Sequence, residues 1–332
     1  MEAPKVGGVG LPVPGALMKT IAPFLFAGAT GWSGIALAAS EMPALEAERW
    51  VNSAPLSPQS LRGKVVLVDV WEYTCINWIR TSPFVKAWNR DYGPLGLVVI
   101  GVHVPEFEFG KRAENIDRGI RDHGLTYTIA IDNGYAIWRA LDNNAWPAKY
   151  LFDAEGRLVR RWIGEGGYEQ TEMEIRRLLM AATPGVTLPP VTAEAMAFTK
   201  GKQPSYSGIT PESYVGTDRR ERGSFKLEGD WKSEREFVEL RGGTGKILLP
   251  FTAGEVNLVV QPGPSGKGAM KVLLDGKPVT DARGADVGAD GVARFDRAGM
   301  VRLVAGAPAK KHILTLDTSE PGLRAYVFTF GP

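Results

Sequence analysis

The chain has 332 residues, a length that suits two domains better than one. Hydrophobic residues make up 44% and charged residues 23% of it, ordinary values for a folded protein. The formal net charge is +2, and the densest basic run, residues 218–222, is interrupted by acidic residues. A nucleic-acid-binding face needs a concentrated basic surface, so we expect no nucleic-acid partner.

The first forty residues differ in composition from the rest. From Met18 onward the chain has a short positive start, then an apolar run with small residues, and then Ala36-Leu37-Ala38. This pattern is typical of a secretory signal with an A-x-A cleavage site. Three glycines and a serine interrupt the apolar run, whereas a membrane span needs about twenty predominantly apolar residues. We therefore expect residues 1–38 to be a signal peptide, with Met18 as an alternative start. Its cleavage leaves a periplasmic or secreted protein with no stable membrane span.

Strand and helix patterns alternate between residues 45 and 182. Strands are expected at 64–71, 97–104, 127–132, 148–154 and 157–164, and helices at 75–92, 111–123, 134–142 and 168–182. Such alternation predicts βαβ units on a mostly parallel sheet. Residues 154–156 between the last two strands predict a hairpin turn.

A different pattern follows this α/β region. Residues 183–205 are rich in proline and predict an extended linker. Beyond it, seven short strands are expected, at 236–240, 246–251, 256–261, 269–274, 300–304, 312–317 and 324–330. Turns rich in Gly and Asp separate them, so residues 206–332 are expected to form an antiparallel β-sandwich.

Cys75 is the only cysteine, and it stands between an apolar run and an expected helix. It cannot form a disulfide within the chain. An unpaired cysteine in an exported protein indicates an intermolecular partner or a free reactive thiol. A helix N-terminus lowers the pKa of a thiol, so we expect Cys75 to be accessible and reactive. The alternative is an inert, buried cysteine.

Several segments carry a resemblance to a known family. Residues 68–75 resemble the strand-to-helix turn of the thioredoxin superfamily, Pro83 lies where that family kinks its first long helix, and Trp146-Pro147 resembles its cis-proline loop. Four sequence segments resemble the exported TlpA-like, DipZ-type branch of this superfamily: WEYTCINWIR, GVHVPEF, AIDNGYAIWRAL and AWPAKYLFDAEG. That branch often carries a C-terminal β-sandwich similar to a carbohydrate-binding module. The resemblance implies a thioredoxin-like α/β domain followed by an all-β, jelly-roll-like sandwich.

The chain departs from this family at the second cysteine. The branch has Cys-x-x-Cys, and this chain has Cys75-Ile76-Asn77-Trp78. A dithiol protein resolves its mixed disulfide with its second thiol, so ordinary dithiol reductase activity is not expected here. The main hypothesis is monothiol redox chemistry, through a mixed disulfide or a sulfenic acid. The partner would be an external thiol reductant or the thiol of a protein or small molecule, without a cofactor.

The candidate catalytic residues besides Cys75 are Asp69, Glu72 and His103. Asp69 has the spacing of the family's buried acid, which implies a proton-transfer role; the alternative is a hydrogen-bonded acid at a strand end. Glu72 is three residues before the cysteine and could tune the thiol or stay solvated. His103 follows a strand whose end should lie beside Cys75, where it could form a thiolate–imidazolium pair or simply end the strand. Thr74 is expected to be the N-cap of the helix.

The candidate substrate-binding residues are Tyr73, Trp78, Glu106, Trp146 and Pro147. Trp78 is one helical turn past Cys75 and could form a pocket for an apolar ligand or serve only in packing. Tyr73 flanks the cysteine, and Glu106 follows the strand expected at 97–104. The resemblance implies a cis bond before Pro147, which would bring the backbone of Trp146 against the sulfur to dock an extended peptide.

Functions other than monothiol chemistry were also considered, namely metal binding, sugar binding, peptide binding and catalysis on a non-thiol substrate. Three histidines, at 103, 123 and 312, are too scattered to predict a zinc site with one cysteine. A sugar-binding surface in the β-sandwich would draw on Tyr206, Tyr214, Trp231 and Asp286, although such aromatics are more often in the core. The alternatives to monothiol chemistry are a non-catalytic protein that binds a peptide or glycan, and a repurposed enzyme acting on a non-thiol substrate.

Overall fold

The computed structural model describes residues 41–200, 205–218 and 224–332. These residues lie within one compact unit, and the expected signal peptide lies outside them. In the described ranges, no helix is both long enough and apolar enough to cross a membrane. We refer to residues 41–182 as the α/β domain and to residues 205–332 as the β-sandwich.

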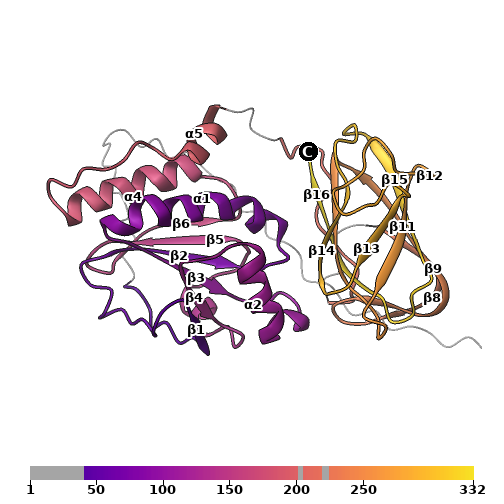
Figure 1. The fold of residues 1–332 in the computed structure, drawn as a ribbon, viewed down its shortest axis with the longest axis horizontal. Helices are drawn as coiled ribbons and strands as arrows, with labels where there is room; N and C mark the ends of the chain where they lie inside the picture. The colour runs from indigo at the N-terminus through magenta and orange to yellow at the C-terminus, as the bar shows by residue number, and fades with distance from the viewer. Residues whose placement is uncertain (1–40, 201–204, 219–223) are drawn as a thin grey trace, which may run out of the picture. The chain divides into compact units, whose positions relative to one another are not determined.

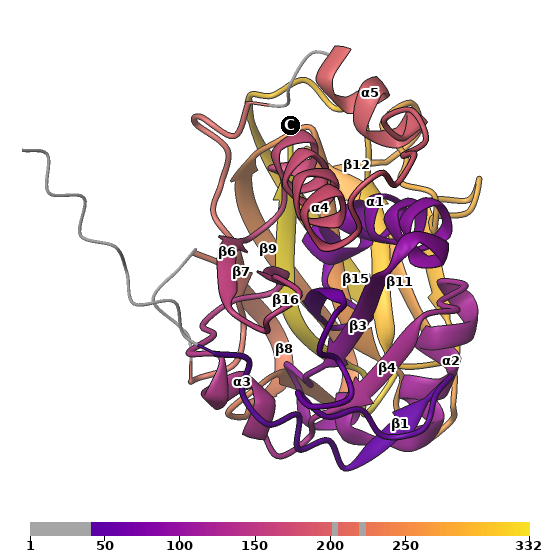
Figure 2. The same ribbon diagram turned by 90° about the vertical axis from the view of Figure 1, so that its left-hand side faces the viewer.

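The α/β domain contains one mixed sheet of six strands in the order β1-β4-β3-β2-β5-β6. Strands β2, β3 and β4 are parallel, and the remaining neighbours are antiparallel. Figure 2 shows β1, β4 and β3 side by side. The strands are β1 (Arg49–Val51), β2 (Val65–Trp71), β3 (Leu97–His103), β4 (Thr128–Ile131), β5 (Ala148–Phe152) and β6 (Leu158–Ile163).

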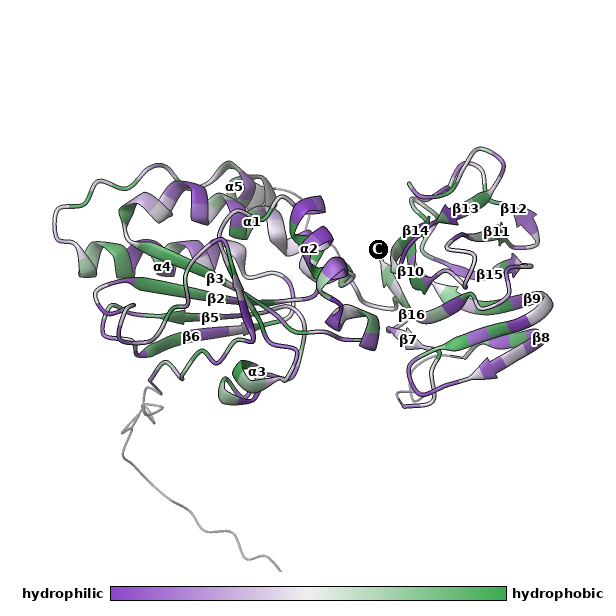
Figure 3. Cartoon of the chain, turned by 60° about the horizontal axis from the view of Figure 1, so that its bottom comes forward, coloured by the Kyte–Doolittle hydropathy of each residue, from purple (hydrophilic) through white to green (hydrophobic). Residues whose placement is uncertain are grey.

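Helices cover both faces of this sheet. Helices α1 and α4 lie along one face (Figure 1), where their apolar residues share a core with β2, β3 and α2. The opposite face is covered by α3 and by the chain that precedes β2. Because β2, β3 and β5 are buried on both sides, they are apolar almost throughout, as the green ribbons of Figure 3 show. The helices are α1 (Ile76–Tyr92), α2 (Ala113–Asp122), α3 (Ala136–Ala140), α4 (Tyr168–Ala182) and α5 (Ala193–Lys200).

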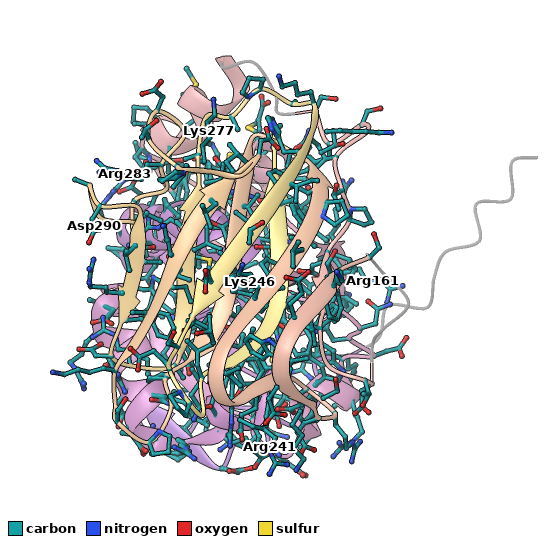
Figure 4. All side chains as sticks on the ribbon, turned by 90° about the vertical axis from the view of Figure 1, so that its right-hand side faces the viewer. Arg161, Arg241, Lys246, Lys277, Arg283 and Asp290 are labelled. Atoms are coloured by element: carbon teal, nitrogen blue, oxygen red, sulfur yellow. The ribbon has the colours of Figure 1, made fainter. Side chains whose placement is uncertain are left out.

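The β-sandwich is built from ten strands of one curled antiparallel sheet. Its main path runs β12-β11-β15-β9-β16-β10-β14, with β13 on β11, β7 on β16 and β8 on β9. Lys246 of β9, labelled in Figure 4, lies between Glu228 and Asp317 on the neighbouring strands, whereas Ile247 belongs to the core. This alternation is the period of a half-buried strand. The strands are β7 (Ser213–Tyr214), β8 (Lys226–Ser233), β9 (Val238–Thr252), β10 (Glu255–Gln261), β11 (Gly268–Leu274), β12 (Lys277–Pro278), β13 (Val292–Phe295), β14 (Gly299–Val304), β15 (Lys311–Thr318) and β16 (Arg324–Gly331).

The expected fold class, an α/β domain followed by an all-β sandwich, is confirmed, but the strands expected within the sandwich were partly wrong. The strands expected at 236–240 and 246–251 are one strand, β9, and β7, β8, β12 and β13 were missed. The glycines at 242, 243 and 245 predicted a turn, but they lie at register shifts where β9 has more residues than β8; Gly243 of β9 has a φ of +67°, and Gly229 of β8 has a φ of +101°. Glycine adopts that left-handed region without the penalty of a Cβ.

The expected linker, residues 183–205, is not extended throughout, because it contains α5. Thr192 begins this helix, and its hydroxyl accepts the Ala195 N–H at 3.4 Å. Thr192 also donates from its backbone N and from Oγ1 to the buried Glu172 of α4, at 2.7 and 2.6 Å. The same carboxylate accepts from Trp88 Nε1 at 3.1 Å and from the Tyr92 hydroxyl at 2.5 Å. Glu172 therefore ties α1, α4 and the start of α5 together.

We expect the substitution Glu172→Gln to destabilise the protein by about 2 kcal/mol, because an amide NH2 would replace one oxygen that accepts buried hydrogen bonds. Urea unfolding of both proteins, followed by tryptophan fluorescence, measures the difference. The matched control is Glu174→Gln on the same helix, which removes only the surface pair with Arg177. Its cost should stay below about 0.5 kcal/mol. Equal losses in the two variants would contradict the anchoring role of Glu172.

Candidate functional site

Cys75 stands at the end of the turn that joins β2 to α1. It is the N-cap residue of α1, with φ −74° and ψ 109°, and its side chain is partly exposed. The prediction that Thr74 caps this helix was wrong. The Thr74 backbone N donates to Glu72 Oε2 at 2.6 Å, and the Thr74 hydroxyl donates to the same oxygen. The turn is therefore held by Glu72, and the sulfur lies at the N-cap of the helix.

The surroundings of Cys75 favour the protonated thiol. Although part of the side chain is accessible, most of it is buried, and this burial raises the pKa of the Cys75 thiol well above its usual range. The carboxyl groups of Glu106, Glu212 and Glu72 raise the pKa further. The backbone N–H of Trp78 acts in the opposite direction but does not compensate. The expectation of a lowered pKa from the helix N-terminus was therefore wrong.

Trp78 occupies the interior of the domain. Its side chain is 0% exposed, and its Nε1 donates to Asp69 Oδ2 at 2.9 Å. The ring contacts Trp71, with centroids 4.6 Å apart, and meets the edge of His123 at 5.1 Å. Of the two interpretations that the sequence left open, packing describes this position, because an indole enclosed on all sides cannot line an open pocket.

Asp69 is completely buried next to Trp78. Burial raises the pKa of its carboxyl to about 7, while the hydrogen bond from Trp78 and the charge of Lys149 oppose the increase. The sequence analysis missed Lys149, which pairs with Asp69 in the register of β2 and β5 and is itself 0% exposed. Burial lowers the pKa of Lys149 to about 8. A lysine within the apolar strand AKYLF was the available signal, since lysine is rarely buried without a partner.

Glu72 is the second buried acid of the site. It is 0% exposed, and burial raises the pKa of its carboxyl to about 8 despite the hydrogen bonds from Thr74. Its Oε1 has no hydrogen-bond partner among the residues that the structure describes. This oxygen lies close to Gly110, where a Cβ would come within 3.4 Å of it. Glu72 is thus predominantly neutral at pH 7.

His103 cannot form the expected imidazolium. It is 0% exposed, and burial lowers the pKa of its ring to about 3. Within the described ranges, neither ring nitrogen has a hydrogen-bond partner. The ring lies between Trp71 and Tyr73, at centroid distances of 4.9 and 6.1 Å. The prediction of a thiolate–imidazolium pair was therefore wrong, because His103 stays neutral.

The remaining candidates have well-defined partners. Tyr73 contacts the ring of Phe109 at 6.3 Å, and Glu106 accepts a hydrogen bond from the Tyr214 hydroxyl at 2.5 Å. Trp146 Nε1 donates to the carbonyl of Val104 at 3.0 Å. The Trp146–Pro147 bond is cis, as the resemblance implies, and Pro147 is buried.

The four residues considered for sugar binding have unrelated partners, so a glycan site is not supported. Trp231 packs on the core of the sandwich and donates to the carbonyl of Glu228 at 3.0 Å. Tyr206 donates to Glu165, Tyr214 to Glu106, and Asp286 pairs with Arg302. Among the described residues, no group of three His, Cys, Asp or Glu side chains could hold a metal ion.

The comparisons with known proteins agree with this architecture. Residues 193–331 match the family described as "Thioredoxin like C-terminal domain". Protein DipZ of Mycobacterium bovis is 37% identical over 256 residues, which cover 70% of this chain and 36% of DipZ. Thiol-disulfide oxidoreductase YkuV of Bacillus subtilis is 29% identical over 139 residues, 42% of this chain and 93% of YkuV. A thioredoxin-like protein solved in its oxidised form is 28% identical, with a TM-score of 0.40, over 43% of this chain and 97% of that one.

By the family match, the C-terminal part of the chain is a thioredoxin-like C-terminal domain, and a mixed α/β domain precedes the β-sandwich. Its homologues include DipZ and thiol-disulfide oxidoreductases. The matched region is about a third of the length of DipZ.

The buried acids make the stability fall as the pH rises, whereas His103, whose pKa burial lowers from 6.5 to about 3, acts in the opposite direction below about pH 6.5. The pKa of Asp69 is about 7 in the folded protein and 3.8 in its ordinary state, so between these values the folded state holds a proton that the unfolded state releases. Glu72 acts in the same direction between 4.5 and about 8. Asp69→Asn keeps a hydrogen-bond acceptor for Trp78. It should reduce the decrease of the free energy of unfolding with pH by about 1.4 kcal/mol per pH unit.

Urea unfolding between about pH 5 and pH 7 measures this slope. The control is Asp296→Asn, which changes an exposed aspartate of the β-sandwich and should keep the slope of the natural protein. If Asp69→Asn leaves the slope unchanged, Asp69 is ionised in the folded protein throughout this range, and our account of its burial is wrong.

Proposed function

We propose that this protein carries out thiol–disulfide exchange with the single thiol of Cys75. The Cys75 thiolate attacks a disulfide, a new S–S bond forms, and one half of the disulfide leaves as a thiolate. An external thiolate then attacks the mixed disulfide and releases Cys75. No electrons are gained or lost in total, because each step exchanges one S–S bond for another.

The observation that carries this proposal is the contrast between residues 75 and 78. The Cys75 side chain is at the N-cap of α1 and partly exposed, whereas the place of a second thiol is filled by a tryptophan hydrogen-bonded to Asp69. A disulfide can therefore reach Cys75, but no internal thiol can resolve the product.

The raised pKa of Cys75 limits the rate of this exchange. At neutral pH the thiol form predominates, so attack on a disulfide is slow. A thiol with a high pKa is also a poor leaving group, so the mixed disulfide, once formed, is reset slowly. The same property disfavours sulfenic acid formation, which needs an exposed thiolate of low pKa. These arguments support a long-lived mixed disulfide instead of rapid turnover.

A second candidate is a non-catalytic binding protein on a thioredoxin scaffold. The neutral His103 and the acids around Cys75 favour it, because none of them activates the thiol. For either candidate we propose the bacterial envelope as the location. The support is the N-terminal pattern of a signal peptide and the similarity to DipZ.

The natural protein should form one mixed disulfide at Cys75 with the disulfide of mercaptoethanol, but it should not reduce insulin with turnover. Trp78→Cys places two thiols at residues 75 and 78, one helical turn apart, where an internal disulfide can form, and should give weak turnover of the disulfide of mercaptoethanol. The substitution removes a buried indole, so we expect a loss of stability of about 3–5 kcal/mol. Intact mass measures the adduct and the internal disulfide, the release of mercaptoethanol measures the turnover of the small disulfide, and the turbidity of reduced insulin measures the turnover of insulin.

Two controls separate the effect of the Cys75 thiol from the effect of changed packing at residue 78. Cys75→Ser should form no adduct, and Trp78→Phe should lose stability without gaining turnover, because it changes packing but adds no thiol. Insulin turnover by the natural protein would show that another resolving group exists. If natural Cys75 forms no adduct even at alkaline pH, the binding-protein candidate replaces the exchange proposal.

A further inference from the structure

The loops around Cys75 are in polar contact with the β-sandwich. Tyr214 of β7 donates its hydroxyl to Glu106, which follows β3, at 2.5 Å. The backbone N–H of Glu108 in the same loop donates to Glu236 Oε2 at 3.0 Å. On α1, Arg80 is five residues past the cysteine and pairs with Glu255 of β10 at 2.6 Å.

An apolar cluster joins the same parts of the chain. Phe107 and Phe109 of the loop after β3 each contact the ring of Tyr326, with centroids 4.9 Å apart. Val259 and Val327 complete the buried part of this cluster, and Tyr73 packs against it from the turn that carries Cys75. This cluster is separate from the core of the β-sandwich. Burial of these side chains stabilises the contact by the hydrophobic effect.

The space left beside these contacts is small. A cavity of about 80 Å³ is lined by Glu106, Phe107, Tyr214, Gly216, Asp218, Arg235 and Glu236. One water needs about 10–15 Å³ of such space, so this cavity takes several waters but not a peptide strand. The carboxyls of Glu106 and Glu212 both act on the Cys75 thiol, and the Tyr214 hydroxyl is shared between them, so the contact reaches the rim of the site.

From this arrangement we infer that Cys75 exchanges with small disulfides and thiols and not with protein disulfides. An extended protein segment that approached the sulfur would have to displace the β-sandwich from Glu106, Phe107 and Phe109. A small disulfide needs only the exposed part of the Cys75 side chain. This inference rests on the proposed exchange function and names its substrate class.

Two reagents with the same chemistry and different size test this. One is the mixed pyridyl disulfide of mercaptoethanol, and the other is the same pyridyl disulfide carried on a long polyethylene glycol. Release of thiopyridone, followed by absorbance at alkaline pH, gives both rates for the full chain. We expect the small reagent to react at least about tenfold faster, which corresponds to about 1.4 kcal/mol. In guanidinium the rates should approach each other.

A variant that opens the contact should remove this difference. Val259 is 2% exposed and faces the apolar cluster, so Val259→Arg places a charge there and leaves the sandwich core intact. It should accelerate the large reagent and leave the rate of the small one unchanged. Ile313→Arg is the matched control, because Ile313 is 51% exposed on β15 and outside the cluster, and it should change neither rate. If Val259→Arg does not fold by circular dichroism, the double variant Arg80→Gln with Tyr214→Phe is used in its place, with the same expected direction.

The outcomes separate the two proposals. Equal rates for both reagents with the natural protein would overturn the size limit and leave the exchange function standing. Absence of reaction with both, while the unfolded chain reacts, would overturn both. An opened variant that keeps the full difference in rate would show that the β-sandwich does not cause it, which also overturns the inference.

Discussion

The hydrogen bond from Trp78 Nε1 to Asp69 Oδ2, 2.9 Å long, joins α1 to β2 in the interior of the thioredoxin-like domain. It gives the indole N–H a buried acceptor, which a tryptophan in this position requires. It also occupies one oxygen of the acid that, by resemblance, would serve a second cysteine. Trp78 occupies the position of a resolving thiol, and Asp69, which would activate that thiol, is its hydrogen-bond acceptor. Both residues therefore serve the packing of the interior. Cys75 is left as a thiol without an internal partner.

The rest of the site follows from the cost of burying charge. Asp69, Glu72, His103 and Lys149 are all 0% exposed, and in each case burial shifts the pKa towards the neutral form. None of these groups stabilises a Cys75 thiolate: His103 is neutral, the carboxyl group of Glu72 disfavours the thiolate, and the charge of Lys149 acts on Asp69. The electrostatics of the site therefore favour a protonated Cys75. A slow exchange with a long-lived adduct is the chemistry that suits this environment.

The sequence was sufficient for those features that depend on local patterns. The alternation of strands and helices and the one-turn spacing of Cys75 and Trp78 agree with the structure. The cis bond before Pro147 also agrees, but it was implied by the family resemblance and not by a local pattern. The sign of the Cys75 pKa shift was wrong because burial and the distant Glu106 and Glu212 outweigh the local helix effect. Lys149 was missed for a related reason, since its partner Asp69 lies eighty residues earlier and only strand pairing brings them together. Proline content likewise did not reveal α5, whose anchor is Glu172 on another helix.

The central claim is that Cys75 is a partly exposed thiol held in its protonated form. The rate of its alkylation by iodoacetamide, measured across pH on the native protein with Cys75→Ser as a blank, tests this most directly. The account predicts a slow reaction at neutral pH and a rate that still rises above about pH 9, the region where an ordinary thiol has already ionised. A rate that levels off below about pH 7 would show a stabilised thiolate and contradict the account.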